Sequence, residues 1–198
     1  MPISSHNLKY FLNKTFVETG SSGLGLGISS ALIAGFQNVY SVEINPKLYK
    51  ECKLIFEKDS RVHLSLGNCG DWIESTLNLI GQPCTIYLDA NGWEMSESPL
   101  ITSLNAIIKT GEKNHLILID DQNPELLTKE NLTANLKQKI DTGWLKLIKE
   151  INQNYSIYLI DTHSEDLKTL YPAWVMVVDP IRDRFLNMTS SDFILRKE

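Results

Sequence analysis

The chain has 198 residues, of which 42% are hydrophobic and 22% charged, a profile that fits one globular domain with a substantial core. Its formal net charge of −5 argues against a broad surface for nucleic acid, because phosphate binding needs clustered Lys and Arg. Three widely spaced cysteines match neither a disulfide framework nor a zinc motif, and neither a signal peptide nor a long apolar run stands out. We therefore expect a cytoplasmic protein with reduced thiols and with no membrane or nucleic-acid partner.

Strand and helix patterns alternate along the first two thirds of the chain. Apolar, β-branched runs predict strands at residues 15–19, 39–44, 62–66, 84–90 and 116–119. Helical spacing between these runs predicts helices at residues 24–36, 46–56, 71–80 and 99–109. Alternation of this kind predicts a parallel sheet with helices on both faces.

The last third is less regular. Residues 122–135 have no clear period, a helix capped by Asp141 and Thr142 is expected to run to Asn152, and residues 155–160 and 174–178 read as two strands. A hairpin-like pairing would make the last strand antiparallel. We predict an α/β fold, a Rossmann-like three-layer sandwich with a mostly parallel seven-stranded sheet. Residues 1–14 would be an N-terminal extension, 15–180 the domain and 181–198 a C-terminal tail.

A glycine-rich turn follows the first strand and opens the first helix. Glycines at positions 20, 23 and 25 let the backbone turn sharply and approach a ligand, and the helix N-terminus favours negative groups. Glu43 ends the second strand, 23 residues after Gly20, where a carboxylate can accept both hydroxyls of a ribose. The alternative is a solvated Glu beside the turn at Asn45 and Pro46.

Polar residues also follow the later strands. After the third strand, Asn68 or Asp71 can bond the edge of an adenine ring, although Asp71 can instead cap the next helix. Asp89 follows the fourth strand, and Asp120 and Asp121 follow the fifth. Three carboxylates at one sheet edge suit Mg²⁺, but strand-end Asp residues are also common turn formers.

Together these motifs resemble the class I S-adenosylmethionine-dependent methyltransferases over residues 15–180. The resemblance implies that the first turn holds the methionine part of the cofactor, that Glu43 holds its ribose, and that residues 68–71 meet adenine. The predicted cofactor-binding residues are Glu18, Thr19, Gly20, Ser21, Gly23, Leu24, Gly25, Glu43, Asn68, Cys69, Asp71 and Asp89.

A narrower similarity is to the macrocin-type sugar O-methyltransferases and to the catechol and caffeoyl-CoA O-methyltransferases. It implies Mg²⁺ on Asp89, Asp120 and Asp121, next to the hydroxyl of a small-molecule acceptor. The candidate catalytic residues are Asp89 and Asn91. Some macrocin-type members carry an Asp proposed as general base where this chain has Asn91, and a neutral amide cannot take that proton. His163 is an alternative base.

Two other classes of protein remain open. Asn91 in place of an acid also fits a non-catalytic sensor or interaction protein that keeps the fold. An NAD(P)-dependent short-chain dehydrogenase has a partly similar turn, but Gly20 and Gly23 are spaced one residue too closely for that family. The Tyr-x-x-x-Lys pair that it needs occurs only at Tyr49 and Lys53, which is far too early in the chain.

Overall fold

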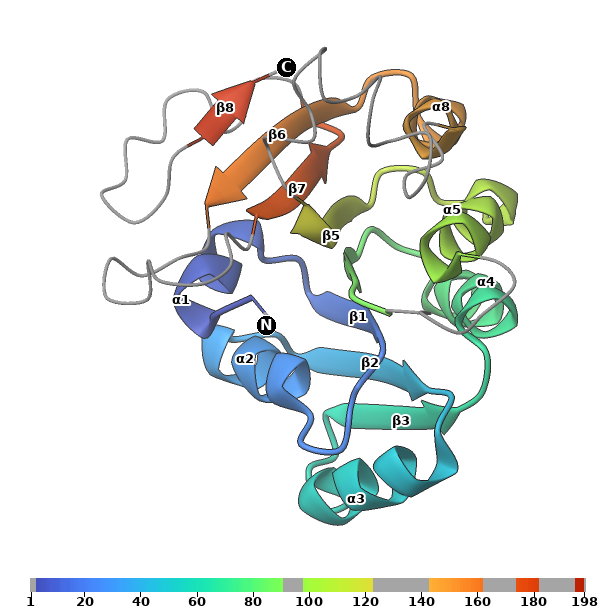
Figure 1. Ribbon diagram of the computed structural model, residues 1–198. Helices are drawn as coiled ribbons and strands as arrows, with labels where there is room; N and C mark the ends of the chain where they lie inside the picture. Colours follow the sequence, from blue (N-terminus) through green and yellow to red (C-terminus); the bar gives the residue numbers. More distant parts are fainter. Residues whose placement is uncertain (1–2, 91–97, 123–142, 162–173, 182–194, 198) are drawn as a thin grey trace.

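The computed structural model describes residues 3–90, 98–122, 143–161, 174–181 and 195–197 (Figure 1). The strands are β1 (Thr15–Thr19), β2 (Asn38–Glu43), β3 (Val62–Leu66), β4 (Thr85–Leu88), β5 (Leu116–Gln122), β6 (Ser156–Asp161), β7 (Trp174–Asp179) and β8 (Leu195–Lys197). The helices are α1 (Ser5–Leu8), the 3₁₀ turn η1 (Lys9–Phe11), α2 (Leu26–Ala34), α3 (Pro46–Phe56), α4 (Cys69–Ile80), α5 (Pro99–Lys109) and α8 (Gly143–Ile151).

All of the described strands belong to one sheet in the order β3-β2-β1-β4-β5-β7-β6-β8. The pairs among β1 to β5 are parallel, whereas β7 runs antiparallel to both β5 and β6. This arrangement confirms the predicted Rossmann-like fold and the antiparallel β7. It adds β8, which pairs antiparallel with β6 at the edge of the sheet and comes from residues expected to be a tail.

Helices cover the two faces of the sheet in two groups (Figure 1). One apolar cluster joins α1, α2 and α3 to side chains such as Phe16 and Leu118. The other joins α4, α5 and α8 to side chains such as Val17 and Ile117. Neighbouring residues of β1 and β5 thus point into opposite layers, and strands buried on both faces explain the unbroken apolar runs of the sequence.

The N-terminal segment, residues 3–13, is part of the first layer. Ile3, Leu8 and Phe11 are at most 1% exposed and belong to the core cluster. The hydroxyl of Thr85 donates to the Phe11 carbonyl over 2.5 Å, and the Asn13 side-chain amide donates to the Thr85 hydroxyl over 3.2 Å. A segment expected to precede the domain therefore packs across β4.

Two helix starts differ from the sequence-based prediction. Helix α2 begins at Leu26 rather than Leu24, because Gly25 has a positive φ of 57° and interrupts the helical path. Helix α4 begins at Cys69, and its N-cap is Asn68, whose side chain accepts the Gly70 N–H over 2.8 Å. The alternative role of Asp71 as the N-cap is therefore wrong.

The expected caps Asp141 and Thr142 lie outside the described residues. Among the helices that are described, none has the length and apolar character needed to cross a membrane.

Candidate functional site

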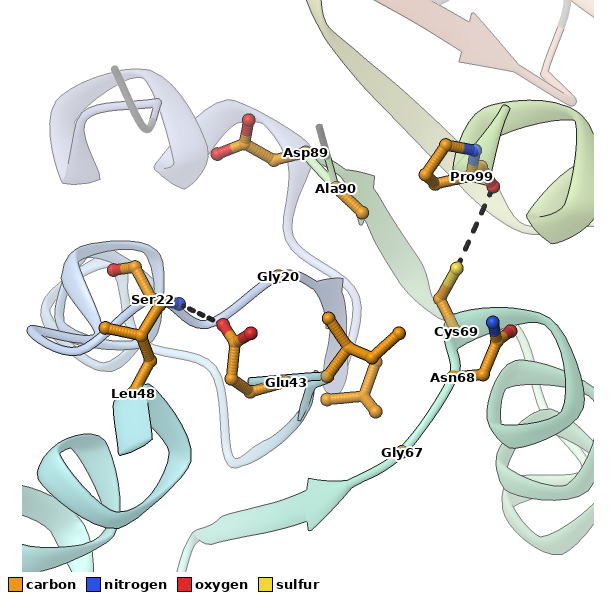
Figure 2. A pocket seen from close by; sticks show the side chains of 12 residues that line it. Gly20, Ser22, Glu43, Leu48, Gly67, Asn68, Cys69, Asp89, Ala90 and Pro99 are labelled. Atoms are coloured by element: carbon orange, nitrogen blue, oxygen red, sulfur yellow. Dashed lines mark hydrogen bonds between the residues drawn. The ribbon is translucent and has the colours of Figure 1, made fainter. Parts of the chain in front are cut away.

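A cavity of about 240 Å³ opens at the carboxyl ends of β1, β2, β3 and β4 (Figure 2). It is lined by Gly20, Ser22, Val42, Glu43, Ile44, Leu48, Gly67, Asn68, Cys69, Asp89, Ala90 and Pro99. This is the edge at which open α/β sheets bind ligands. The volume lies just below the range of about 300–1,000 Å³ typical of small-molecule sites, so the cavity can hold part of a small molecule.

The sheet register places three carboxylates and one glycine in a single row. Thr19 pairs with Val42 on one side and Leu88 on the other, and Leu88 pairs with Ile119. One residue further along, the row reads Glu43, Gly20, Asp89 and Asp120. Because residues level with one another in adjacent strands share a face, these residues project toward the same layer.

Gly20 keeps the row open between Glu43 and Asp89 (Figure 2). Its φ of +89° is strained for any residue with a side chain. A Cβ atom at this position would also lie 3.3 Å from the Asp89 carbonyl oxygen and from the Ala90 Cα. A larger residue would therefore strain the turn and fill the space beside both carboxylates.

Glu43 is fastened to the turn by its own carboxylate. One oxygen, Oε2, accepts the Ser22 N–H over 2.9 Å, and the other, Oε1, accepts the Asn45 N–H over 2.9 Å. The residue is only 6% exposed, yet it lines the cavity. A carboxylate has about four acceptor sites, so each oxygen retains capacity for one hydroxyl of a ligand.

The other glycines of the turn face away from the cavity. A Cβ at Gly23 would lie 2.6 Å from the Glu51 carboxylate of α3, and one at Gly25 would lie 2.4 Å from the Phe56 ring. These two positions let the turn pack closely against α3. Neither they nor Leu24, which is 66% exposed, are among the residues that line the cavity.

Glu18 and its neighbours lie behind the cavity wall. The Glu18 side chain is 1% exposed and accepts the Ser41 hydroxyl over 2.8 Å. Burial raises the pKa of Glu18 to about 7. Thr19 and Ser21 are also buried, and none of these three predicted cofactor-binding residues lines the cavity.

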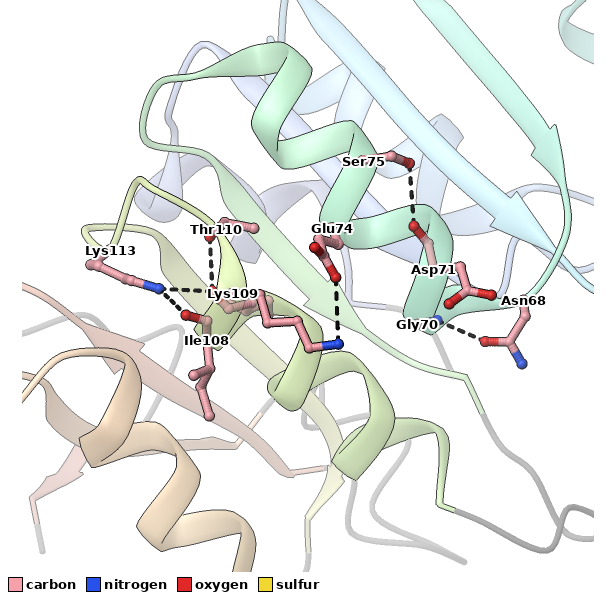
Figure 3. Close-up of polar contacts among 10 residues, drawn as sticks. Asn68, Gly70, Asp71, Glu74, Ser75, Ile108, Lys109, Thr110 and Lys113 are labelled. Carbon is pink, nitrogen blue, oxygen red and sulfur yellow. Dashed lines mark hydrogen bonds and ion pairs between the residues drawn. The ribbon is translucent and has the colours of Figure 1, made fainter.

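The start of α4 contributes Asn68 and Cys69 to the cavity (Figure 2). The Cys69 thiol donates to the Pro99 carbonyl over 3.9 Å. Deeper along the two helices, Lys109 and Glu74 form an ion pair over 3.6 Å (Figure 3). Helices α4 and α5 are thus joined at both places, whereas Asp71 is exposed and does not line the cavity.

The acidic strand ends meet around one buried phenol. The Tyr87 hydroxyl donates to Asp120 Oδ2 over 2.5 Å and accepts the Ile3 N–H over 3.0 Å. Burial, followed by the charges of Asp120 and Asp89, raises the pKa of Tyr87 well above its usual value. Asp89 and Asp120 therefore lie close to the same hydroxyl, as expected from their strand-end positions.

The structure describes only part of the predicted metal site. The side chain of Asp121, and the residues Asn91 and His163, lie outside the described part of the chain. Within that part, no group of three or more His, Cys, Asp or Glu side chains could hold a metal ion. Asp89 and Asp120 supply two carboxylates, and Mg²⁺ binding remains a prediction.

The sequence reasoning missed several residues that line the cavity. Ser22 lies within the glycine-rich turn and Gly67 directly precedes residues 68–71, whereas Val42, Ile44 and Ala90 lie at or near the ends of predicted strands. Those five could have been inferred from their neighbours. Leu48 and Pro99 come from α3 and α5, and only the packing of these helices on the sheet brings them to the cavity.

No protein-family model matches the sequence, and no curated protein matches it either. Solved structures match the fold at low sequence identity. An O-methyltransferase from Bacillus cereus in complex with SAH matches with a TM-score of 0.58 and 14% identity, covering 88% of this chain and 78% of that one. The methyltransferase domain of bacterial CtHen1 matches with a TM-score of 0.57 and 14% identity, covering 88% and 94%.

A TehB-like SAM-dependent methyltransferase from Corynebacterium glutamicum matches with a TM-score of 0.55 and 13% identity, covering 88% of this chain and 85% of that one. The chain therefore has the Rossmann-like fold of S-adenosylmethionine-dependent methyltransferases. Identities of this size show the fold alone, so the chemistry has to be argued from the cavity.

Proposed function

We propose that this cavity binds S-adenosylmethionine and that the protein transfers its methyl group to a hydroxyl of a small-molecule acceptor. One observation carries the proposal. Gly20 and the Glu43 carboxylate border the same cavity, and that carboxylate is anchored to the backbone of the glycine turn. This is the geometry that a ribose with two neighbouring hydroxyls requires.

The residues present fit this cofactor. Glu43 would accept the ribose hydroxyls, and Asn68 and Ile44 would border the adenine ring with a polar edge and an apolar face. Gly20 and Ser22 would adjoin the methionine part. The bound cofactor supplies a methyl group on a positively charged sulfur, which an acceptor oxygen can attack.

The chain itself contributes position and charge. The row formed by Glu43, Asp89 and Asp120 gives the sheet edge a negative character that suits a cationic ligand. Holding the methyl donor and the acceptor in line can contribute several powers of ten to the rate of such an enzyme. Asp89 is the described carboxylate that both lines the cavity and adjoins Asp120, so we propose that the acceptor hydroxyl docks there.

Metal assistance belongs to the same proposal. Asp89, Asp120 and Asp121 would be the carboxylate ligands, and Mg²⁺ would lower the pKa of the acceptor hydroxyl. An Asp121→Ala variant is then expected to lose any dependence on Mg²⁺ while keeping its affinity for the cofactor.

Calorimetric titration with S-adenosylmethionine and S-adenosylhomocysteine, with and without Mg²⁺, tests the cofactor assignment. Glu43→Ala is expected to weaken binding of both ligands at least about tenfold, because it removes charge-assisted bonds to the ribose. Glu43→Gln keeps one acceptor oxygen and should lose less affinity.

A matched control is Glu51→Ala, which removes an exposed carboxylate from the outer side of the same turn. It should bind both ligands as the wild type does. Unchanged affinity in Glu43→Ala would refute the ribose role, and tight binding of NAD⁺ in place of S-adenosylmethionine would favour the dehydrogenase reading.

The second candidate is a sensor that binds the cofactor without turning it over. Asn91 favours this candidate, because an amide cannot serve as the general base. Binding without release of S-adenosylhomocysteine, across a panel of hydroxyl acceptors, would distinguish the sensor from the enzyme.

A further inference from the structure

Glu18 is a buried carboxyl group with little to stabilise its charge. In the register it lies level with Ser41 of β2 and Tyr87 of β4, on the face that α2 and α3 cover. The Ser41 hydroxyl donates to Oε2, and Oε1 faces the Cα of Gly27, where an added Cβ would lie only 1.7 Å away. The carboxyl group thus fills the space between β1, β2 and the first turn of α2.

The groups facing Glu18 are neutral or negative near pH 7. Burial is the main cause that raises the pKa of Glu18, the Ser41 hydrogen bond lowers it, and the charge of Glu43 on β2 raises it to a smaller extent. The Cys52 thiol of α3, with a pKa raised to about 11, and the Tyr87 phenol of β4 both stay protonated. Gly27 of α2 has no ionisable group. Within the described residues, no cation contributes to this environment.

The position of Glu18 links it to the cavity without contact to a ligand. It precedes Gly20, the residue that directly follows β1, by two positions, and its partner Ser41 precedes Glu43 by two residues on β2. Both Gly20 and Glu43 line the cavity, whereas Glu18 does not. A positive charge placed in the cavity would therefore act on the buried Glu18 through protein rather than water, where electrostatic forces are stronger.

We propose that Glu18 is a positioning residue of the cofactor site, which braces the glycine turn against β2 and gives up a proton when a cationic ligand enters the cavity. The inference rests on the proposed function. When S-adenosylmethionine binds, its sulfonium charge favours the Glu18 carboxylate, and the displaced proton passes to the solvent. By linkage, affinity for the cation must then rise with pH.

Two ligands that differ in charge provide the test. S-adenosylmethionine carries the sulfonium, whereas S-adenosylhomocysteine has a neutral thioether and the same amino-acid part. The ratio of their affinities, measured by calorimetry from pH 6 to pH 8, isolates the effect of the sulfonium charge. For the wild type, the ratio should shift about three- to tenfold toward S-adenosylmethionine as the pH rises. This is the size expected for attraction between the sulfonium and the Glu18 carboxylate at a moderate effective dielectric constant.

The number of protons released on binding can be measured by repeating the titrations in two buffers. Phosphate has a small ionisation enthalpy and Tris a large one, so the difference in binding heat reports the protons released. The wild type should release a fraction of a proton near pH 7 with S-adenosylmethionine and less with S-adenosylhomocysteine. Glu18→Gln keeps the shape and the acceptor for Ser41 but cannot titrate, so its affinity ratio should be flat and its proton release should vanish.

Two further variants separate titration from a merely structural role. Ser41→Ala removes the hydrogen bond that lowers the pKa of Glu18, so the pH profile should move to higher pH without flattening. Glu51→Gln changes an exposed carboxylate on α3 near the turn and should keep the wild-type profile.

A flat wild-type ratio, or a Glu18→Gln variant that keeps the slope, would overturn the inference while leaving cofactor binding intact. Absence of binding of both ligands to the wild type would refute the proposed function as well.

Discussion

Tyr87 joins three parts of the chain through a single hydroxyl group. It accepts from the backbone of Ile3, donates to Asp120, and stands one strand away from Glu18. Its ring packs near Phe16, with the ring centroids 6.1 Å apart. The hydroxyl therefore holds one oxygen of the Asp120 carboxylate and ties the N-terminal segment to β4.

We expect Tyr87→Phe to lower the free energy of unfolding by about 1–3 kcal/mol, because it strips a buried carboxylate of a hydrogen-bond donor. The ring itself is kept, so packing should change little. Urea denaturation at pH 7 measures this loss.

Tyr155→Phe is the matched control at the opposite end of the sheet. The Tyr155 hydroxyl donates to the neutral Lys113 carbonyl over 2.9 Å, so its loss should cost only about 0.5–1.5 kcal/mol. If Tyr87→Phe and Tyr155→Phe lose the same free energy of unfolding, the Tyr87 hydroxyl does not stabilise the Asp120 carboxylate as we expect.

At the scale of whole elements, the N-terminal segment takes the place of a covering helix over β4. Ser4 caps α1, because its side chain accepts the Asn7 N–H. The chain then turns through η1, and Phe11 at the end of this turn packs in the core. So short a helix has little stability of its own, and its order comes from the apolar side chains that it buries.

Leu8→Ala should therefore destabilise the protein by about 2–5 kcal/mol, the usual cost of emptying a fully buried leucine site. Leu12→Ala, in the same segment but 44% exposed, should cost much less. Denaturant unfolding of the two variants gives the comparison. Equal losses would mean that the segment is not part of the core.

At the scale of the molecule, the buried side chains of His115 and Glu18 change the stability of the fold in opposite directions as the pH falls. The His115 side chain is fully buried and accepts the Cys84 N–H, and burial lowers the pKa of His115 to about 4. Its contribution to stability is complete above the unfolded value near 6.5 and is lost as the pH falls toward 4.

Glu18 has the opposite sign, because its folded pKa of about 7 lies above the unfolded value of 4.5. Its contribution is complete below 4.5 and is lost as the pH rises to 7. Each contribution amounts to at most about 3.5 kcal/mol, so the two largely cancel between pH 4.5 and 6.5.

Glu18→Gln should remove the Glu18 contribution, so that the effect of His115 on the pH dependence of stability can be measured. The variant is expected to be more stable than the wild type at pH 7 and to lose stability more steeply as the pH falls to 4.5. Urea unfolding at pH 4.5, 5.5 and 7 tests this difference between the two proteins. Parallel curves would show that Glu18 is not the titrating group.

Local patterns were enough to predict the alternating elements, the parallel sheet, the antiparallel β7 and the positions of Gly20, Glu43, Asp89 and Asp120 at one edge. Periodicity and turn chemistry report on neighbours a few residues away, and the carboxyl ends of parallel strands meet whatever the detailed packing. The sequence alone thus determined the class of fold and the edge of the sheet at which the cavity opens.

Only the tertiary structure decided which residues face the cavity. The packing of α3 places Gly23 and Gly25 against that helix and outside the cavity lining, and it brings Leu48 to the cavity. The bond from Ile3 to Tyr87 spans 84 residues of sequence, and the contact of Glu18 with Gly27 depends on how α2 lies on β1. Such contacts have no periodic signature, because they arise from how the helices fit on the sheet after the local elements have formed.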